Sequence, residues 1–418
     1  MIMRRPSTHD AIVIGAGPAG TSLALLLARR GWSVAIVEKK MFPRRKVCGE
    51  YISASNLALL DRLEVGDAWR ANAGPEIRRV GFFSGATCIE APMPGAKYGP
   101  PVEGTFGRAL GRDMLDHLLL QAARSAGAEI FQPCRAVAID QDGDMQAVRI
   151  QAKDENSGDG TTILRAPVVV AAHGSWEPGP LPSQLEKASH PSDLLGFKAH
   201  FAGASLASDL MPLLIFPGGY GGMVLADHGR MSISCCIRRD MLARLRMNHV
   251  SEPDRPRQDG HPSAAEAVFR HLMASCRDVS DALDRACLDG PWLAAGPIRP
   301  GIRACYEKDI FRVGNAAGES HPIIAEGISM ALQSSWLLAA ELAGASSGRA
   351  GREAAGRRYK AAWKRLFSTR VYAAAAIART ALCPGGAALM GAAVRSFPQA
   401  LTLGAHMSGK TRAIPGLG

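Results

Sequence analysis

The chain has 418 residues, of which 47% are hydrophobic and 21% charged, which excludes an intrinsically disordered protein and predicts a folded one. The length exceeds what one ordinary core holds, so we expect two interleaved domains. Nine cysteines without a C-x-x-C pair exclude a disulfide framework and a zinc site of that type, and we expect no bound metal. Residues 1–10 are polar and basic with no signal-peptide segment, so we expect a cytoplasmic protein.

The formal net charge of +11 is concentrated near the C-terminus, where residues 341–418 hold twelve Lys or Arg and two Glu. Such an excess is typical of a solvated helical face, or of peripheral contact with anionic lipid at the inner face of a membrane. No recognition motif or row of stacking aromatics accompanies it, so we expect no nucleic-acid partner. Arg379 and Pro384 interrupt the most apolar stretch, residues 371–394, and no membrane span is expected.

The first predicted elements form a βαβ unit. Residues 11–14 are predicted to be a buried parallel strand, residues 21–30 an amphipathic helix, and residues 33–37 a second strand. The turn between the first strand and the helix has the pattern G-x-G-x-x-G. This context makes the pattern much more specific than the glycines would be alone.

Each glycine of the turn has a separate role. Gly15 makes the tight turn, Gly17 lets the backbone approach a pyrophosphate, and Gly20 lets helix and strand pack closely. The helix N-terminus offers free N–H groups to phosphates, and Glu38 after the second strand can accept hydrogen bonds from ribose hydroxyls. The unit therefore predicts a dinucleotide site. Its expected contacts are Gly15, Gly17, Pro18, Ala19, Gly20, Glu38 and Lys39.

The remaining elements alternate between helices and short strands. Residues 41–53 are predicted to be a loop, residues 55–63 a helix, and residues 91–105 a Gly- and Pro-rich crossing between domains. The other expected elements are a hairpin of 79–83 with 87–90, a helix at 111–127, strands at 129–132, 136–140, 147–152, 161–165 and 168–172, antiparallel strands within 194–237, an exposed loop at 251–262, a helix at 263–274, a strand at 310–313 and a helix at 328–342.

This order predicts an α/β protein in three parts. A discontinuous nucleotide-binding domain takes residues 8–90, 105–185 and 290–342, and a mostly antiparallel-sheet domain that binds substrate takes residues 91–104 and 186–289. Residues 343–418 form a C-terminal helical basic region.

Four separated motifs point to one family. They are the Gly15 to Glu38 unit, Arg112 at the start of an apolar helix, the loop Arg44 to Glu50 with its Cys-Gly-Glu sequence, and the segment from Gly314 to Ile328 with Gly-Asn-Ala-Ala, Pro and Gly-Ile. Together they resemble the FAD-dependent oxidoreductases of the p-hydroxybenzoate hydroxylase fold, the superfamily of group A flavin monooxygenases and geranylgeranyl reductases.

The resemblance implies a GR2-type Rossmann-like FAD-binding domain interleaved with the substrate domain, with FAD as cofactor and NAD(P)H as reductant. The further FAD contacts that it implies are Arg44, Cys48, Gly49, Arg112, Val137, Gly314, Asn315, Gly327 and Ile328.

The sequence departs from the family pattern at two positions. Asn315 replaces the usual Asp, so an amide can still bond hydroxyls but the charge is lost, and His173 replaces an Asp linked to the nicotinamide donor, which puts direct docking of NAD(P)H in doubt. The flavin halogenases share the loop around Cys48, but their Trp-x-Trp-x-Ile-Pro element and essential lysine are missing, and Arg78 and Arg79 occupy the corresponding region.

Three functions are compatible with the resemblance. The expected one is an NAD(P)H-dependent flavin monooxygenase that hydroxylates or oxidises a small apolar or aromatic biosynthetic intermediate. The second is a reductase of alkene bonds in a prenyl or lipid substrate, like geranylgeranyl reductase, and the third is a flavin-binding protein without turnover. The cofactor performs such chemistry, so no catalytic triad is needed.

The candidates for catalysis are Cys48, Glu50 and His321, each with a plainer alternative. Cys48 could contact substrate or pack as a small residue, and Glu50 could donate a proton or pair with Arg44 or Lys46. The candidates for the substrate pocket are Phe216, Pro217, Tyr220 and His321.

Overall fold

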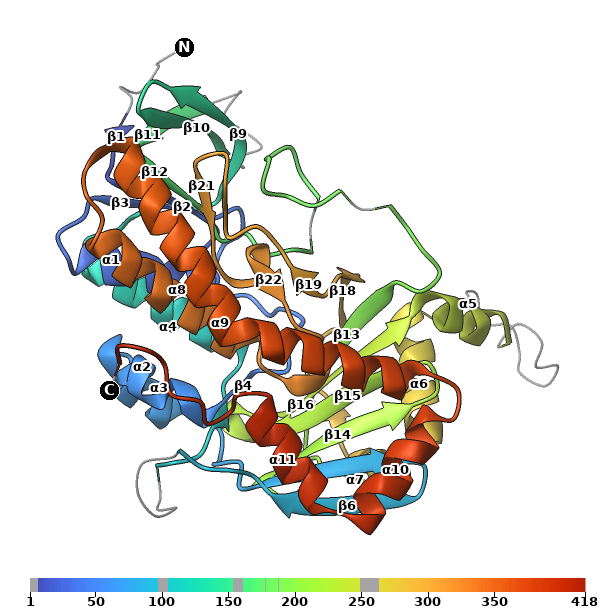
Figure 1. Cartoon of the computed structure of the whole chain (residues 1–418). Coiled ribbons are helices and arrows are strands. Elements are labelled where there is room, and N and C mark those ends of the chain that lie inside the picture. The colour runs from blue at the N-terminus through green and yellow to red at the C-terminus, as the bar shows by residue number, and fades with distance from the viewer. Residues whose placement is uncertain are drawn as a thin grey trace.

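The computed structural model describes residues 7–96, 104–152, 161–176, 178–186, 188–248 and 263–417. A parallel sheet with its helices lies at the upper left of Figure 1, a larger sheet lies at the lower right, and one long helix, α9 (Gly348–Leu382), runs across both. The expected loop at 251–262 lies outside the described residues, as do residues 97–103 of the expected crossing at 91–105.

The nucleotide-binding βαβ unit forms the centre of a six-stranded sheet. Its strands, in spatial order, are β20 (Tyr306–Glu307), β21 (Ile310–Arg312), β12 (Val168–Ala171), β2 (Ala11–Ile14), β3 (Val34–Val37) and β8 (Glu129–Phe131). All pair in parallel except β20. Because the strands alternate their side chains between two faces, Val13 packs against helices and Ile12 against a second sheet.

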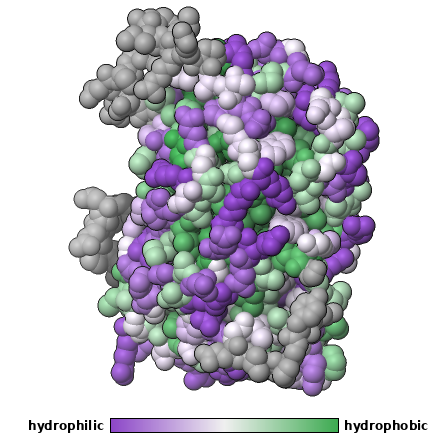
Figure 2. All heavy atoms as spheres, turned by 90° about the vertical axis from the view of Figure 1, so that its left-hand side faces the viewer, coloured by the Kyte–Doolittle hydropathy of each residue, from purple (hydrophilic) through white to green (hydrophobic). Residues whose placement is uncertain are grey.

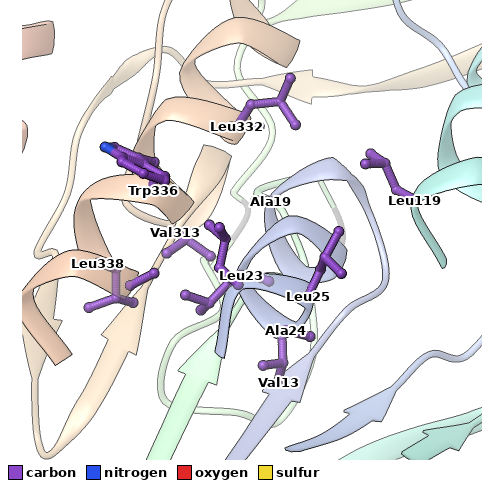
Figure 3. Packing of buried hydrophobic residues seen from close by; sticks show 14 of the residues in the cluster. Val13, Ala19, Leu23, Ala24, Leu25, Leu119, Val313, Leu332, Trp336 and Leu338 are labelled. Atoms are coloured by element: carbon purple, nitrogen blue, oxygen red, sulfur yellow. The ribbon is translucent and has the colours of Figure 1, made fainter. Parts of the chain in front are cut away.

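Three helices cover one face of this sheet. The helix α1 (Pro18–Ala28) lies between α4 (Arg112–Ser125) and α8 (Gly327–Ala343), as Figure 3 shows. The buried side chains of Leu23, Leu119 and Leu332 come from these three helices and belong to one core. A four-stranded sheet covers the other face. Its strands are β1 (Ser7–Thr8), β11 (Thr161–Ala166), β10 (Met145–Ala152) and β9 (Cys134–Asp142).

The second large sheet is mostly antiparallel. Its strands, in order, are β17 (Cys287–Leu288), β13 (Leu194–Ala202), β16 (Met231–Arg238), β15 (Gly219–Leu225), β14 (Leu210–Phe216), β5 (Arg79–Ser84) and β6 (Thr87–Pro92), with β18 (Leu293–Ile298) beside β13. The predicted hairpin of 79–90 is present, but it does not lie with the nucleotide-binding domain as expected. The reason is that β5 pairs in parallel with β14, a pairing over long sequence separation that no local pattern reports.

Helices cover both faces of the large sheet. On one face lie α5 (Arg239–Asn248), α6 (Ala264–Ser275) and α7 (Arg277–Leu283), packed on a core that includes Phe197 and Ile233. On the other lie the C-terminal part of α9 and then α10 (Gly386–Ser396), with α11 (Gln399–Met407) beside β5 and β6. Short elements complete the fold: β4 (Tyr51–Ile52), η1 (Ala54–Asn56), α2 (Leu57–Arg62), α3 (Gly66–Asn72), β7 (Arg108–Ala109), η2 (Asp227–Gly229), β19 (Gly301–Ile302), η3 (Gly314–Ala316), β22 (Gly318–Glu319) and η4 (Pro322–Ile324).

Within the described residues, no single helix is both long and apolar enough to cross a membrane, and α9 and α10 reach that length and composition only together, across a bend of 113°.

Candidate functional site

A continuous cavity of about 510 Å³ is lined by residues of both the parallel and the large sheet. This volume lies within the range of ligand pockets. At one end, which we call the nucleotide end, the lining includes Gly15, Glu38 and Arg44. At the other, which we call the apolar end, it includes Phe82 and Leu401. Other apolar-end residues are Val80, Met211, Pro212, Leu213, Tyr220, Met223, Val224, Ile298, Ile323, Ile324, Ile377, Met390 and Val394.

The glycine turn after β2 forms one wall of the nucleotide end. Gly15 has φ +109°, a left-handed conformation, and a side chain there would meet the Ala172 carbonyl at 2.6 Å. Gly17 is the N-cap of α1, and no side chain caps that helix, so its first N–H groups are available to an anion. Gly20 does not line the cavity. A side chain at Gly20 would collide with the Gly15 carbonyl, so the glycine lets the turn and the helix pack closely.

Glu38 lies at the end of β3 with its carboxylate fixed from two sides. The backbone N–H of Ala16 donates to one carboxylate oxygen at 2.9 Å, and that of Lys40 donates to the other at 2.9 Å. The Arg44 guanidinium approaches at 3.7 Å. The side chain is buried, yet it lines the cavity. This geometry presents an oriented carboxylate to a ribose.

Arg112 is the first residue of α4 and is held by a bidentate ion pair. Its Nε and one terminal nitrogen each donate to Asp116 at 2.7 Å, one turn later in the helix. Burial lowers the pKa of Arg112, but Asp116 and the adjacent Cys48 thiol raise the pKa above its ordinary value. The guanidinium is therefore a permanent cation in the cavity lining, beside Gly17.

Lys46 adds a second cation to this wall. Its ammonium lies 5.6 Å from the centre of the Trp176 ring. Burial, together with the cations Arg112 and Arg44, lowers the pKa of Lys46 to about 8. A bound diphosphate would relieve the repulsion among these three cations.

The segment after β21 forms the opposite wall. Gly314 has φ +58°, and its N–H donates to the Ser334 hydroxyl at 2.9 Å. The Asn315 side-chain amide donates to Glu319 at 2.9 Å. Glu319 also accepts from the Ser175 hydroxyl at 2.6 Å and lines the cavity. The negative charge that Asn315 lacks is thus present four residues later.

The N-terminus of α8 points its uncapped N–H groups at the cavity through Gly327 and Ile328. Its N-cap residue, Glu326, is fully buried and pairs with Lys410, whose Nζ lies 3.0 Å from Glu326 Oε1. Lys410 also donates to the Ile324 carbonyl at 2.8 Å and lines the cavity. A residue of the C-terminal segment therefore completes the cofactor wall.

Glu50 is neither paired with Arg44 or Lys46 nor able to donate a proton at neutral pH. Its carboxylate pairs with Lys198 and accepts from His200 at 2.9 Å, and both partners lie on β13. Burial raises the pKa of Glu50, but Lys198 and the His200 hydrogen bond lower the pKa to about 2 overall. Glu50 also accepts from the Arg112 N–H at 3.0 Å, so it joins the Cys48 loop, α4 and the large sheet.

His173 is satisfied within the protein. Its Nδ1 donates to the Gly174 carbonyl at 2.8 Å, and its Nε2 lies 2.8 Å from the Ser183 hydroxyl. Burial, which outweighs the Gly174 bond, lowers the pKa of His173 to about 4, so the ring is neutral and supplies no charge to a nicotinamide. His173 is therefore held by its own hydrogen bonds at the end of β12.

Only one of the residues expected around the substrate lines the cavity. Tyr220 lines the apolar end, and its hydroxyl lies 3.2 Å from Nδ1 of His321, which stands behind it rather than in the lining. Phe216 is buried on the far face of the sheet against His271, and the Pro217 carbonyl accepts from that same His271 at 2.8 Å. Neither Phe216 nor Pro217 lines the cavity.

Most of the expected cofactor residues do line it. These are Gly15, Gly17, Pro18, Ala19, Glu38, Lys39, Arg44, Cys48, Gly49, Arg112, Gly314, Asn315, Gly327 and Ile328. Val137 does not, because on β9 its neighbour Ala136 points to that side.

Sequence reasoning missed Lys198, Glu319 and Lys410. A lysine inside the apolar run of β13 was the one signal available for Lys198, since a buried lysine needs a partner. Glu319 and Lys410 had no such signal, because tertiary folding brings Ser175 and Trp176 to Glu319, and Glu326 to Lys410.

The cavity residues fit FAD. Two uncapped helix N-termini, the oriented Glu38 carboxylate and the cations around Gly17 are the groups that an adenine dinucleotide needs, and the apolar end extends the cavity beyond them.

Several known proteins are similar to this chain. Residues 8–362 match the family model of the FAD binding domain. A menaquinone reductase of Mycobacterium tuberculosis is 32% identical over 149 residues, which is 35% of this chain and 34% of that protein. A digeranylgeranylglycerophospholipid reductase 2 of Methanopyrus kandleri is 26% identical over 331 residues, 77% of this chain and 74% of that protein. The rifampicin monooxygenase of Rhodococcus hoagii is 25% identical over 357 residues, 80% of this chain and 64% of that protein.

The fold has solved counterparts. The myxobacterial chondrochloren halogenase CndH superposes with a TM-score of 0.72 at 18% identity, over 97% of this chain and 91% of that one. The family match covers most of the chain, and most of the residues expected to bind FAD line one cavity. The chain therefore belongs to the FAD-dependent oxidoreductases of the p-hydroxybenzoate hydroxylase fold.

Proposed function

We propose that this protein reduces carbon–carbon double bonds in an isoprenoid chain or a similarly long apolar substrate, with FAD as cofactor. The observation that carries the proposal is the continuity of the cavity. It runs from the nucleotide end past Cys48 and Gly49 into a lining of aliphatic, methionine and aromatic side chains. Such a lining binds an apolar chain by burial of its surface.

Residues at the nucleotide end bind the cofactor, and residues at the apolar end bind the substrate. When bound, FAD supplies hydride and electron transfer. Glu38 and the cations Arg44 and Arg112 hold the dinucleotide, while Phe82 and Met223 hold the alkene and exclude water. Saturation of one double bond takes two electrons and two protons, one carbon receiving a hydride and the other a proton. The electrons come from an external donor such as NAD(P)H.

One observation favours reduction among the reactions of the family. The relatives named above include two reductases whose names refer to isoprenoid lipids. Reduction also needs a proton. Glu50, with its pKa lowered to about 2, and His173, with its pKa lowered to about 4, are not acids at pH 7, whereas the Cys48 thiol lines the cavity beside Arg112. Cys48 is our candidate for the group that holds the proton.

Oxygenation of an apolar or aromatic substrate is the second candidate. It is favoured by the rifampicin monooxygenase, which aligns with 80% of this chain. The same apolar end would serve it, so the two reactions must be separated by their products.

A substrate panel tests the proposal. The holoprotein, reduced with dithionite without oxygen, is offered menaquinone and geranylgeranyl lipids, and mass spectrometry follows the gain of hydrogen. We expect products whose prenyl chain gains pairs of hydrogens, which fragmentation distinguishes from reduction of the quinone ring by dithionite. No hydrogen gain on any chain in this sample, together with an oxygenated product when the same panel is repeated in air, would overturn it.

One variant tests whether the apolar end holds the chain. Gly404 lines the cavity, and a Cβ added there would meet no atom within 4 Å, so Gly404→Leu is chosen to narrow the apolar end. We expect it to reduce turnover of long substrates more than of short ones. Ala392→Leu, at an exposed position of α10, is the matched control and should change neither.

A further inference from the structure

The C-terminal helices expose large apolar side chains on their outer face. Leu389 on α10, Phe397 after it, and Leu403 and Met407 on α11 are each more than half exposed. Leu403 and Met407 are four residues apart, so they lie on one side of α11. We call these four residues the apolar face. Clusters of exposed apolar residues mark interaction sites.

The apolar face is one helix away from the cavity. On α11, Leu401, Gly404 and Ala405 line the cavity while Leu403 and Met407 face outward. On α10, Met390 and Val394 line the cavity while Leu389 faces outward. The wall between the apolar end and the outside is thus a single layer, at the lower right of Figure 1.

The charged side chains of the C-terminal region are all positive from residue 354 onward. Residues 354–418 contain no Asp or Glu and ten Lys or Arg. On α9 the exposed residues Arg365, Tyr372 and Arg379 recur every seven positions and so follow one side of the helix. A tyrosine between two arginines, beside apolar residues, is typical of a helix at a membrane interface.

Figure 2 shows the left-hand side of Figure 1, where hydrophilic and hydrophobic side chains are interspersed.

We propose that the apolar face and the exposed side of α9 dock on an anionic lipid bilayer. Apolar side chains would enter the boundary between headgroups and acyl chains, and Arg365 and Arg379 would contact lipid phosphates. Charge decides against a second copy of this chain, because a symmetric dimer through this face would bring like charges together. The docking proposal rests only on the exposed apolar residues and the positive charge of this surface. Its consequence, that the substrate enters the apolar end from the bilayer, rests on the proposed function.

Vesicle flotation of the full-length holoprotein tests the docking. Vesicles of phosphatidylcholine alone are compared with vesicles that also contain phosphatidylglycerol. We expect binding to the anionic vesicles, and about a tenfold or greater loss of binding for the double variant Leu403→Glu with Met407→Glu. The control is Met247→Glu with Leu288→Glu, two exposed apolar residues outside the C-terminal helices, which should bind as the parent does.

The outcomes separate docking from the reaction. Bound FAD absorbance and circular dichroism check that each variant is folded, and Leu389→Glu gives an independent second test. Turnover of a detergent-dispersed substrate should be unchanged in these variants, since none of the substituted residues lines the cavity. Equal vesicle binding by all variants would overturn the proposal. So would a change of oligomeric state in solution, which would identify the apolar face as a contact between copies.

Discussion

Lys410 and Glu326 form a buried ion pair that joins the C-terminal segment to the start of α8, with Nζ 3.0 Å from Oε1. Arg370 lies 4.0 Å from the other carboxylate oxygen, and the Ser53 hydroxyl donates to it at 3.3 Å. The cofactor wall formed by Gly327 and Ile328 begins at this pair, so the C-terminal segment and the cofactor site should lose stability together.

Replacing Lys410 tests that link. Lys410→Met leaves the buried Glu326 with a weaker set of partners, and we expect the free energy of unfolding to fall by about 3–5 kcal/mol and FAD to dissociate more readily. Thermal unfolding and flavin fluorescence measure the two effects. Arg412→Met removes an exposed cation two residues away and should cost much less. Equal losses in both variants would contradict the link, whereas Glu326→Gln added to Lys410→Met should recover part of the stability.

Glu50→Gln tests the buried cluster of Glu50, Lys198 and His200. The change leaves the Lys198 ammonium buried without its counter-ion, so we expect unfolding to become easier by about 3–5 kcal/mol. Adding Lys198→Met should recover part of the loss. If Glu50 instead donated a proton during turnover, Glu50→Gln would abolish activity with little change in stability.

Asn315→Asp tests why an amide stands where the family has a carboxylate. The new carboxylate would lie near 2.9 Å from Glu319, so the two negative charges would repel. We expect lower thermal stability and weaker FAD binding, despite the return to the usual family residue. The double variant Asn315→Asp with Glu319→Gln should recover both. A more stable single variant would show that Glu319 does not replace the missing charge.

Two histidines predict a loss of stability in mild acid. Burial lowers the pKa of His173 and of His321 to about 4, below the ordinary 6.5 of the unfolded chain. Between pH 6.5 and 4 the unfolded state binds more protons, so the free energy of unfolding should fall as the pH falls through that window. Chemical unfolding at several pH values measures it. His173→Asn and His321→Asn should each make the free energy of unfolding depend less steeply on pH. An unchanged slope in both variants would mean that neither ring is neutral in the fold.

The nucleotide end could be predicted from sequence because its groups lie within short motifs. Gly15, Gly17 and Glu38 belong to one βαβ unit, and their spacing follows from strand and helix geometry. The segment from Gly314 to Ile328 is also a short motif, but its role was predicted from its resemblance to a family motif.

The rest of the site depends on contacts over long sequence separation. Glu50 meets Lys198, and Glu326 meets Lys410, only after the two sheets and the C-terminal segment have packed. The prediction that Phe216 lies in the substrate pocket was also wrong, because its side chain packs on the face of the sheet opposite the cavity.

Isotope labelling of the product tests the central claim most directly. The holoprotein, an electron donor and a prenyl lipid are incubated in deuterated water under heavy oxygen gas, with an oxygen-free sample in parallel. Reduction of a double bond predicts a product with deuterium on carbon, no heavy oxygen, and the same yield without oxygen. A product that contains heavy oxygen and fails to form without it would contradict the account and establish oxygenation.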